Sequence, residues 1–152
     1  MTNYEYKYNF TYIINKENKT SLIEGTKYNN QNTFKLLGTK YKLENNVIYD
    51  VNDNIVTNLT DYDITLLEPS NIINLLNTAI NKEITKYNDG NIKTEYTFED
   101  MLITTYEENN YIIKIDLDLT NYMVKLNPKI TYYTINITYE NINNIDSFNE
   151  LW

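Results

Sequence analysis

The sequence predicts an α+β fold in which a strongly curved antiparallel sheet, an unclosed barrel of about ten strands, packs over one central helix. Most of the chain alternates apolar and polar residues with a period of two, which is typical of half-buried strands. The 152 residues include 16 Tyr, and Tyr favours pleated, half-buried surfaces. Helical spacing occurs in one segment near the middle. A chain of this length fits a single domain over residues 1–152 with one core.

Five short antiparallel strands are expected before the helix. The first covers residues 4–14, "YEYKYNFTYII", and places only aromatic residues and Ile on one face. Gly38 is interpreted as a bulge or a bend between the two halves of the third strand. Asn and Asp in the intervening turns tolerate the left-handed geometry of tight hairpins. The other four predicted strands cover residues 21–28, 33–43, 47–51 and 54–59.

One helix is predicted over residues 69–87. Pro69 suits a first helical turn, and "NDG" at residues 88–90 supplies a stop signal. The segment should bury one face against the sheet and expose the other. Its apolar stripe at helical spacing consists of Ile72, Ile73, Leu76, Ala79, Ile80, Ile84 and Tyr87.

A second antiparallel meander should follow the helix, because the period returns to two. Its five predicted strands cover residues 92–98, 101–106, 111–119, 122–126 and 129–142. Pro128 marks the break before the last strand, since Pro cannot donate a ladder hydrogen bond. The tail that follows carries Phe148, Leu151 and Trp152, and either caps a barrel end or frays.

Composition excludes several classes of function. The net charge is -8 and all 13 basic residues are Lys, which argues against nucleic acid as a partner. The chain has no Cys and no His, so thiol nucleophiles, His bases, zinc sites and disulfides are absent from the sequence. We therefore expect no enzyme activity and no cofactor. No apolar run reaches the roughly 18 residues of a membrane span.

Two carboxylate patterns favour structural interpretations. Residues 50–61 resemble a calcium loop, but Ile55 and Asp61 stand where Gly and Glu are required. A hairpin explains that segment better, and no metal site is expected. Asp116 and Asp118 share one strand face, as do Asp61 and Asp63. Residues two apart on a strand lie about 6.5 to 7 Å from each other, and these carboxylates are expected to face water.

The order of elements resembles the LolA/LppX-like group of envelope lipoproteins. The resemblance is carried by the aromatic strand with "NFTYIINKENKTSLIEGTKYNNQNTFKL", by "YKLENNVIYDVNDNIVTNL", by the Pro-started "EPSNIINLL" and by the final "ITYENI". It implies an unclosed antiparallel barrel that folds over a helix and encloses an apolar cavity. It also implies an extracytoplasmic, membrane-anchored protein whose signal peptide and lipobox Cys were trimmed, since this sequence has no Cys. Typical members begin with a helix, which this chain lacks.

Two functions follow from these patterns. In the first, a lipid or other apolar small molecule is sequestered between sheet and helix, and the only membrane contact is a lipid anchor outside this sequence. In the second, the aromatic face is a filled core, and the protein is a structural or protein-interaction domain that uses a sheet edge or an exposed Tyr-rich face. The protein partner is unknown. The residues expected to line a cavity are Tyr6, Tyr8, Phe10, Tyr12, Ile73, Leu76, Ile80, Ile115, Leu117, Tyr133 and Ile135.

Overall fold

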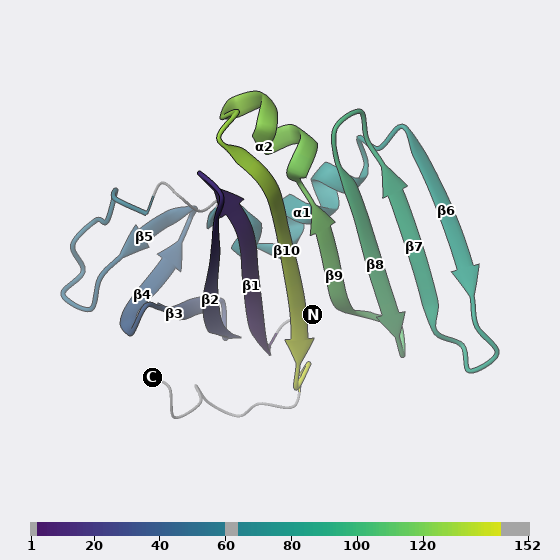
Figure 1. Cartoon of the computed structure of the whole chain (residues 1–152). Helices are drawn as coiled ribbons and strands as arrows, with labels where there is room; N and C mark the ends of the chain where they lie inside the picture. Colours follow the sequence, from purple (N-terminus) through teal and green to yellow (C-terminus); the bar gives the residue numbers. More distant parts are fainter. Residues whose placement is uncertain (1–2, 60–63, 144–152) are drawn as a thin grey trace.

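The computed structural model describes residues 3–59 and 64–143. Within these residues the chain forms one ten-stranded antiparallel sheet and two short α-helices (Figure 1). The strands are β1 (Tyr4–Ile14), β2 (Glu17–Tyr28), β3 (Gln31–Leu36), β4 (Thr39–Glu44), β5 (Val47–Tyr49), β6 (Asn81–Lys86), β7 (Ile92–Thr97), β8 (Leu102–Glu108), β9 (Tyr111–Asp118) and β10 (Ile130–Glu140). The helices are the 3-10 turn η1 (Ile64–Leu67), α1 (Pro69–Leu76) and α2 (Thr120–Leu126).

Two meanders meet in the middle of the sheet. The strand order is β5-β4-β3-β2-β1-β10-β9-β8-β7-β6, so the first and last strands of the chain are neighbours. Their antiparallel register runs from Glu5 opposite Glu140 to Ile14 opposite Ile130. β5 and β6 lie at opposite ends of the sheet (Figure 1). The predicted unclosed antiparallel sheet is therefore confirmed.

Tight two-residue turns connect five pairs of neighbouring strands. Both residues of each turn have positive φ, as in the type I′ turns that match the twist of a hairpin. Asn adopts this conformation more readily than other residues with a side chain. Four turns begin with Asn and one begins with Leu. The turns are Asn15-Lys16, Asn29-Asn30, Leu37-Gly38, Asn45-Asn46 and Asn109-Asn110.

The two faces of the sheet differ in polarity. We call one the core face; its buried residues include Tyr4, Tyr6, Tyr8, Phe10, Ile23, Phe34, Ile115, Leu117, Ile135, Ile137 and Tyr139. η1 and α1 pack on this face, where Ile72 and Leu76 join the same buried cluster. The Tyr8 hydroxyl donates a hydrogen bond to the Leu66 carbonyl oxygen. The opposite, outer face carries Lys7, Asn9, Thr11, Leu22, Glu24, Lys35, Asp116 and Asn136.

The predicted helix over residues 69–87 is wrong in its second half. α1 ends at Leu76, and Asn81–Lys86 form strand β6 paired with β7. The "NDG" that indicated a helix stop instead turns this hairpin, with Gly90 at φ +88°. Its turn is closed by the Tyr87 N–H, which donates to the Asn91 carbonyl oxygen at 2.9 Å. β-Branched Ile84 and Thr85 suit the strand better than a helix.

The predicted strand over residues 33–43 is two strands. Gly38 is the second residue of the turn between β3 and β4, with φ +80°, and is not a bulge. Residues 54–59 form no strand; Ile55 makes a single bridge with Tyr49. The Asp50 carboxylate closes the intervening loop by accepting hydrogen bonds from the backbone N–H groups of Asn52 and Asn54, at 2.8 and 3.0 Å.

The predicted strand over residues 122–126 is helix α2. Contacts at its N-terminal end hold it in place: the Thr120 N–H donates to the Asp118 carboxylate at 3.1 Å. The Tyr133 N–H donates to the Thr120 hydroxyl oxygen, also at 3.1 Å. Tertiary contacts thus override the strand preference of Tyr122 and Val124. The predicted tail contacts of residues 148, 151 and 152 lie outside the described residues.

Candidate functional site

Eight of the predicted cavity-lining residues lie together on the core face. The strand registers place Phe10 opposite Ile135, and Ile135 opposite Leu117. Tyr12 lies opposite Tyr133, with stacked rings whose centroids are 5.4 Å apart. The other residues of this group are Tyr6, Tyr8 and Ile115, all at most 2% exposed. The period of two thus correctly predicted which side chains share a face.

The three residues predicted on the helical wall are not brought together. Leu76 is buried under the sheet, but Ile73 is 48% exposed on α1. Ile80 is 74% exposed, because the helix ends before it and β6 begins just after it. Of the three, Leu76 alone is therefore buried, and on α1 it is joined by buried Ile72. That the core face encloses a ligand stays a prediction.

The hydroxyls of Tyr6, Tyr8 and Tyr139 on the core face are engaged in internal hydrogen bonds. The Tyr6 hydroxyl donates to the amide oxygen of Asn32. The NH₂ group of the same Asn32 side chain donates to the Glu68 carboxylate at 3.3 Å. The ammonium of Lys27 lies 3.0 Å from the other Glu68 oxygen. The Tyr8 and Tyr139 hydroxyl oxygens are 3.2 Å apart. This network ties β1, β2 and β3 to the residue that precedes α1, which favours a structural role.

Burial keeps these phenols neutral. Desolvation, reinforced by the nearby phenols, raises the pKa of Tyr4, Tyr6 and Tyr8 well above the usual value. Desolvation also raises the pKa of Tyr139 to about 12. A phenol with a pKa this high is a poor general base near neutral pH. The cluster therefore supports packing and hydrogen bonding rather than acid–base chemistry.

Tyr4 differs from its neighbours because its hydroxyl, although buried, has no hydrogen-bond partner among the described residues. We expect Tyr4→Phe to leave the free energy of unfolding unchanged or to raise it by up to about 1 kcal/mol, since an unsatisfied polar group is removed. Tyr8→Phe, which loses hydrogen bonds, should lower it by about 1 to 2 kcal/mol. Urea denaturation measures both. An equal loss in both variants would contradict this account.

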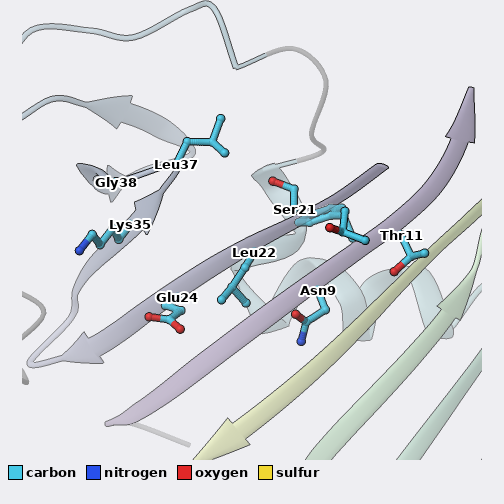
Figure 2. A pocket seen from close by; sticks show the side chains of 10 residues that line it. Asn9, Thr11, Ser21, Leu22, Glu24, Lys35, Leu37 and Gly38 are labelled. Atoms are coloured by element: carbon cyan, nitrogen blue, oxygen red, sulfur yellow. The ribbon is translucent and has the colours of Figure 1, made fainter. Parts of the chain in front are cut away.

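The outer face carries a hollow of about 470 Å³ across β1, β2 and β3. Figure 2 shows it with the helix behind the strands. Asn9, Leu22 and Glu24 form part of its floor, and Lys35 and Leu37 rise on its β3 side. The remaining lining residues are Phe10, Thr11, Thr20, Ser21 and Gly38.

The hollow combines apolar and charged groups. Leu22 is 38% exposed and Leu37 is 81% exposed. Glu24 and Lys35 are directly opposed in the β2–β3 register. Of the residues that line the hollow, Phe10 alone was predicted as a site residue. A usable signal was present, because "LLGT" places Leu at a position where the other two-residue turns have Asn.

The carboxylates considered from the sequence form no converging site. Asp116 accepts a hydrogen bond from the Asn136 amide at 2.6 Å and lies 3.7 Å from the Lys114 ammonium. Asp118 is exposed. Asp61 and Asp63 lie outside the described residues. Within residues 3–59 and 64–143, no group of three or more acidic side chains is placed to hold a metal ion.

Comparison with known proteins adds no assignment to this geometry. No protein-family model matches the chain, and a search of the curated proteins finds no match. None of the helices in the described part of the chain is both long and apolar enough to cross a membrane. The candidate site therefore rests on the geometry of the outer face and of the sheet edges.

Proposed function

We propose that the protein is a non-catalytic interaction domain that binds an extended segment of another protein. The segment would lie along the open edge of β2, beside the hollow on the outer face. In this mode, main-chain hydrogen bonds to a sheet edge give affinity, and side-chain pockets give specificity. The proposal corresponds to the second function considered from the sequence, in which the aromatic face is a filled core.

The open edge of β2 lies next to the hollow. β1 pairs with β2 along its whole length, as far as Glu17 opposite Ile14. β3 pairs only with the later half of β2, from Ile23 to Tyr28. Residues 17–20, all exposed, therefore have β1 as their one strand neighbour among the described residues. An added strand would continue the line of β3 and meet the Leu37-Gly38 turn.

Leu37 is the observation that carries the proposal. It adopts φ +51°, a conformation that costs an ordinary residue roughly 1 to 2 kcal/mol. Its side chain is 81% exposed, so packing does not offset that cost. Strained residues of this kind cluster at binding sites, where the strain is retained for function. An exposed apolar side chain at the rim of a hollow is suited to contact a partner.

Other edges fit a partner less well. β5 has three residues, and Ile55 bridges to it. β6 is fully exposed and carries Lys82, Glu83 and Lys86, and charged residues on an edge strand oppose further pairing. The β2 edge also carries Glu17 and Lys19, so the choice of that edge rests on the hollow and on Leu37 beside it.

Four expectations from the sequence stay predictions. They are strong curvature of the sheet, kinship with the LolA/LppX-like group, an extracytoplasmic, lipid-anchored location, and carriage of an apolar ligand. Organic extraction followed by native mass spectrometry would detect such a ligand.

Selection of peptides from a random display library on the purified protein tests the proposed function. We expect recovered peptides to bind at the hollow, and backbone N-methylation at alternate positions to abolish binding, because an added strand needs its N–H groups. Leu37→Asn should weaken binding and raise the free energy of unfolding by about 1 kcal/mol, since Asn suits a type I′ turn. Recovery of no peptide, or equal binding to Leu37→Asn, would contradict the proposal.

A further inference from the structure

Two lysines face each other across the hairpin that borders the hollow. Lys35 on β3 is directly opposite Lys40 on β4 in the strand register. Like charges in directly opposed positions destabilise a sheet. No ion pair within the described residues involves either ammonium group, although Lys42, two residues further from the turn than Lys40, pairs with Asp53 at 2.6 Å. Glu24 lies opposite Lys35 on the β2 side, and a ligand carboxylate beside Lys40 would relieve the repulsion that remains.

The distribution of charge along the chain points to the same ligand chemistry. Residues 1–44, which contain β1 to β4, carry seven Lys and four Glu. Residues 45–152 carry six Lys and 17 Asp or Glu. The hollow therefore lies in the basic part of a chain whose net charge is -8. Charge complementarity at such a surface selects an acidic partner over other partners.

The apolar side chains in the hollow set a second requirement for the ligand. Leu22 and Leu37 both line the hollow and both expose their side chains. A partner side chain that covers them must be apolar to gain from burial. We infer that the segment bound at the β2 edge is acidic and carries one apolar side chain, with its carboxylate at Lys35 and Lys40. This inference rests on the proposed function and specifies its ligand.

Sequencing of the recovered display peptides tests the inference. We expect Asp or Glu beside an apolar residue to be enriched. Non-specific attraction to a chain of net charge -8 would enrich basic peptides instead, so acidic enrichment reports a local site. Synthetic copies of the recovered peptides should bind Lys35→Glu about tenfold more weakly than the original protein, and more weakly at high salt.

A charge-matched variant controls this experiment. Lys82→Glu makes the same change in net charge on exposed β6, at the far end of the sheet, and should leave affinity unchanged. Lys35→Glu places a carboxylate opposite Lys40 on one side and opposite Glu24 on the other, so circular dichroism must first show that the variant keeps its fold. Neutral or basic peptides, or acidic peptides that bind Lys35→Glu unchanged, would overturn the inference but leave the proposed function standing. Recovery of no peptide would overturn both.

Discussion

Replacing Gly25 with Ala is expected to lower the free energy of unfolding by about 2 to 3 kcal/mol, because the core face has no room for another methyl group. Gly25 lies between Tyr6 and Phe34 in the strand registers. A Cβ atom at this position would lie 2.0 Å from the Cζ atom of Tyr6. The phenol ring thus covers the backbone of its cross-strand glycine, an arrangement that stabilises glycine in sheets.

Tyr6 cannot move aside without losing other contacts. Its hydroxyl donates to Asn32, and its ring centroid lies 6.1 Å from that of Tyr4 and 5.6 Å from that of Tyr8. Displacing the ring would break the hydrogen bond and disturb two aromatic contacts. The loss should therefore appear in full in the free energy of unfolding, measured by urea denaturation.

Two comparisons separate the steric effect from a general loss of glycine. Gly90→Ala has open space for its Cβ but φ +88°, so it should cost only about 1 kcal/mol of backbone strain. A double-mutant cycle with Tyr6→Val removes the ring that causes the clash. Gly25→Ala should cost much less in that background. An equal cost with and without the Tyr6 ring would show that the clash is not the cause.

The sequence predicts strands reliably where burial differs between the two faces. β1 occupies the predicted residues because its alternating aromatic side chains are buried on one side. In β6, by contrast, every residue is exposed. The helical spacing of Ile80 and Ile84 therefore did not correspond to burial of these side chains in the core. The helical pattern there was accidental, and pairing with β7 decided the structure. α2 was missed because its stability depends on contacts with β10.

The candidate site depends on register, which the sequence does not reveal directly. β3 ends at Leu36, which lies opposite Ile23 of β2, whereas β2 begins six residues earlier, at Glu17. The hollow and the open edge lie beside this first part of β2, which does not pair with β3. That offset follows from the position of the Leu37-Gly38 turn. The prediction of a bulge or a bend between two strand halves marked the break at Gly38 but kept residues 33–43 as one strand, so the tight turn and the edge beside it were not predicted. A Leu-Gly pair between two alternating runs was the local signal for a hairpin.

Alkaline pH is expected to unfold the protein cooperatively, starting above pH 10. Tyr4, Tyr6, Tyr8 and Tyr139 have pKa values raised by burial from the ordinary value of 10.0. Below pH 10 these phenols are protonated in both states, so their burial contributes no pH dependence. Above pH 10 the unfolded chain loses protons that the folded chain retains, and stability therefore falls as pH rises.

The expected loss is comparable to the stability of a typical domain. The Tyr139 pKa of about 12 corresponds to a loss of roughly 2 kcal/mol by pH 12. The three other buried phenols act in the same direction, and small domains have only about 5 to 15 kcal/mol in total. Urea denaturation at a series of pH values, followed by circular dichroism, measures the slope. Tyrosinate absorbance should show the buried phenols ionising only as the fold is lost.

Phenylalanine variants identify the groups responsible. Tyr139→Phe removes one buried phenol. The slope of the unfolding free energy against pH should therefore decrease by an amount that corresponds to the release of up to one proton on unfolding. Tyr132→Phe is the matched control, because Tyr132 is 39% exposed on the same strand and should leave the slope unchanged. If stability stayed constant between pH 10 and 12, the tyrosine cluster could not be the buried, neutral core described above, and the aromatic face would have to be open to solvent.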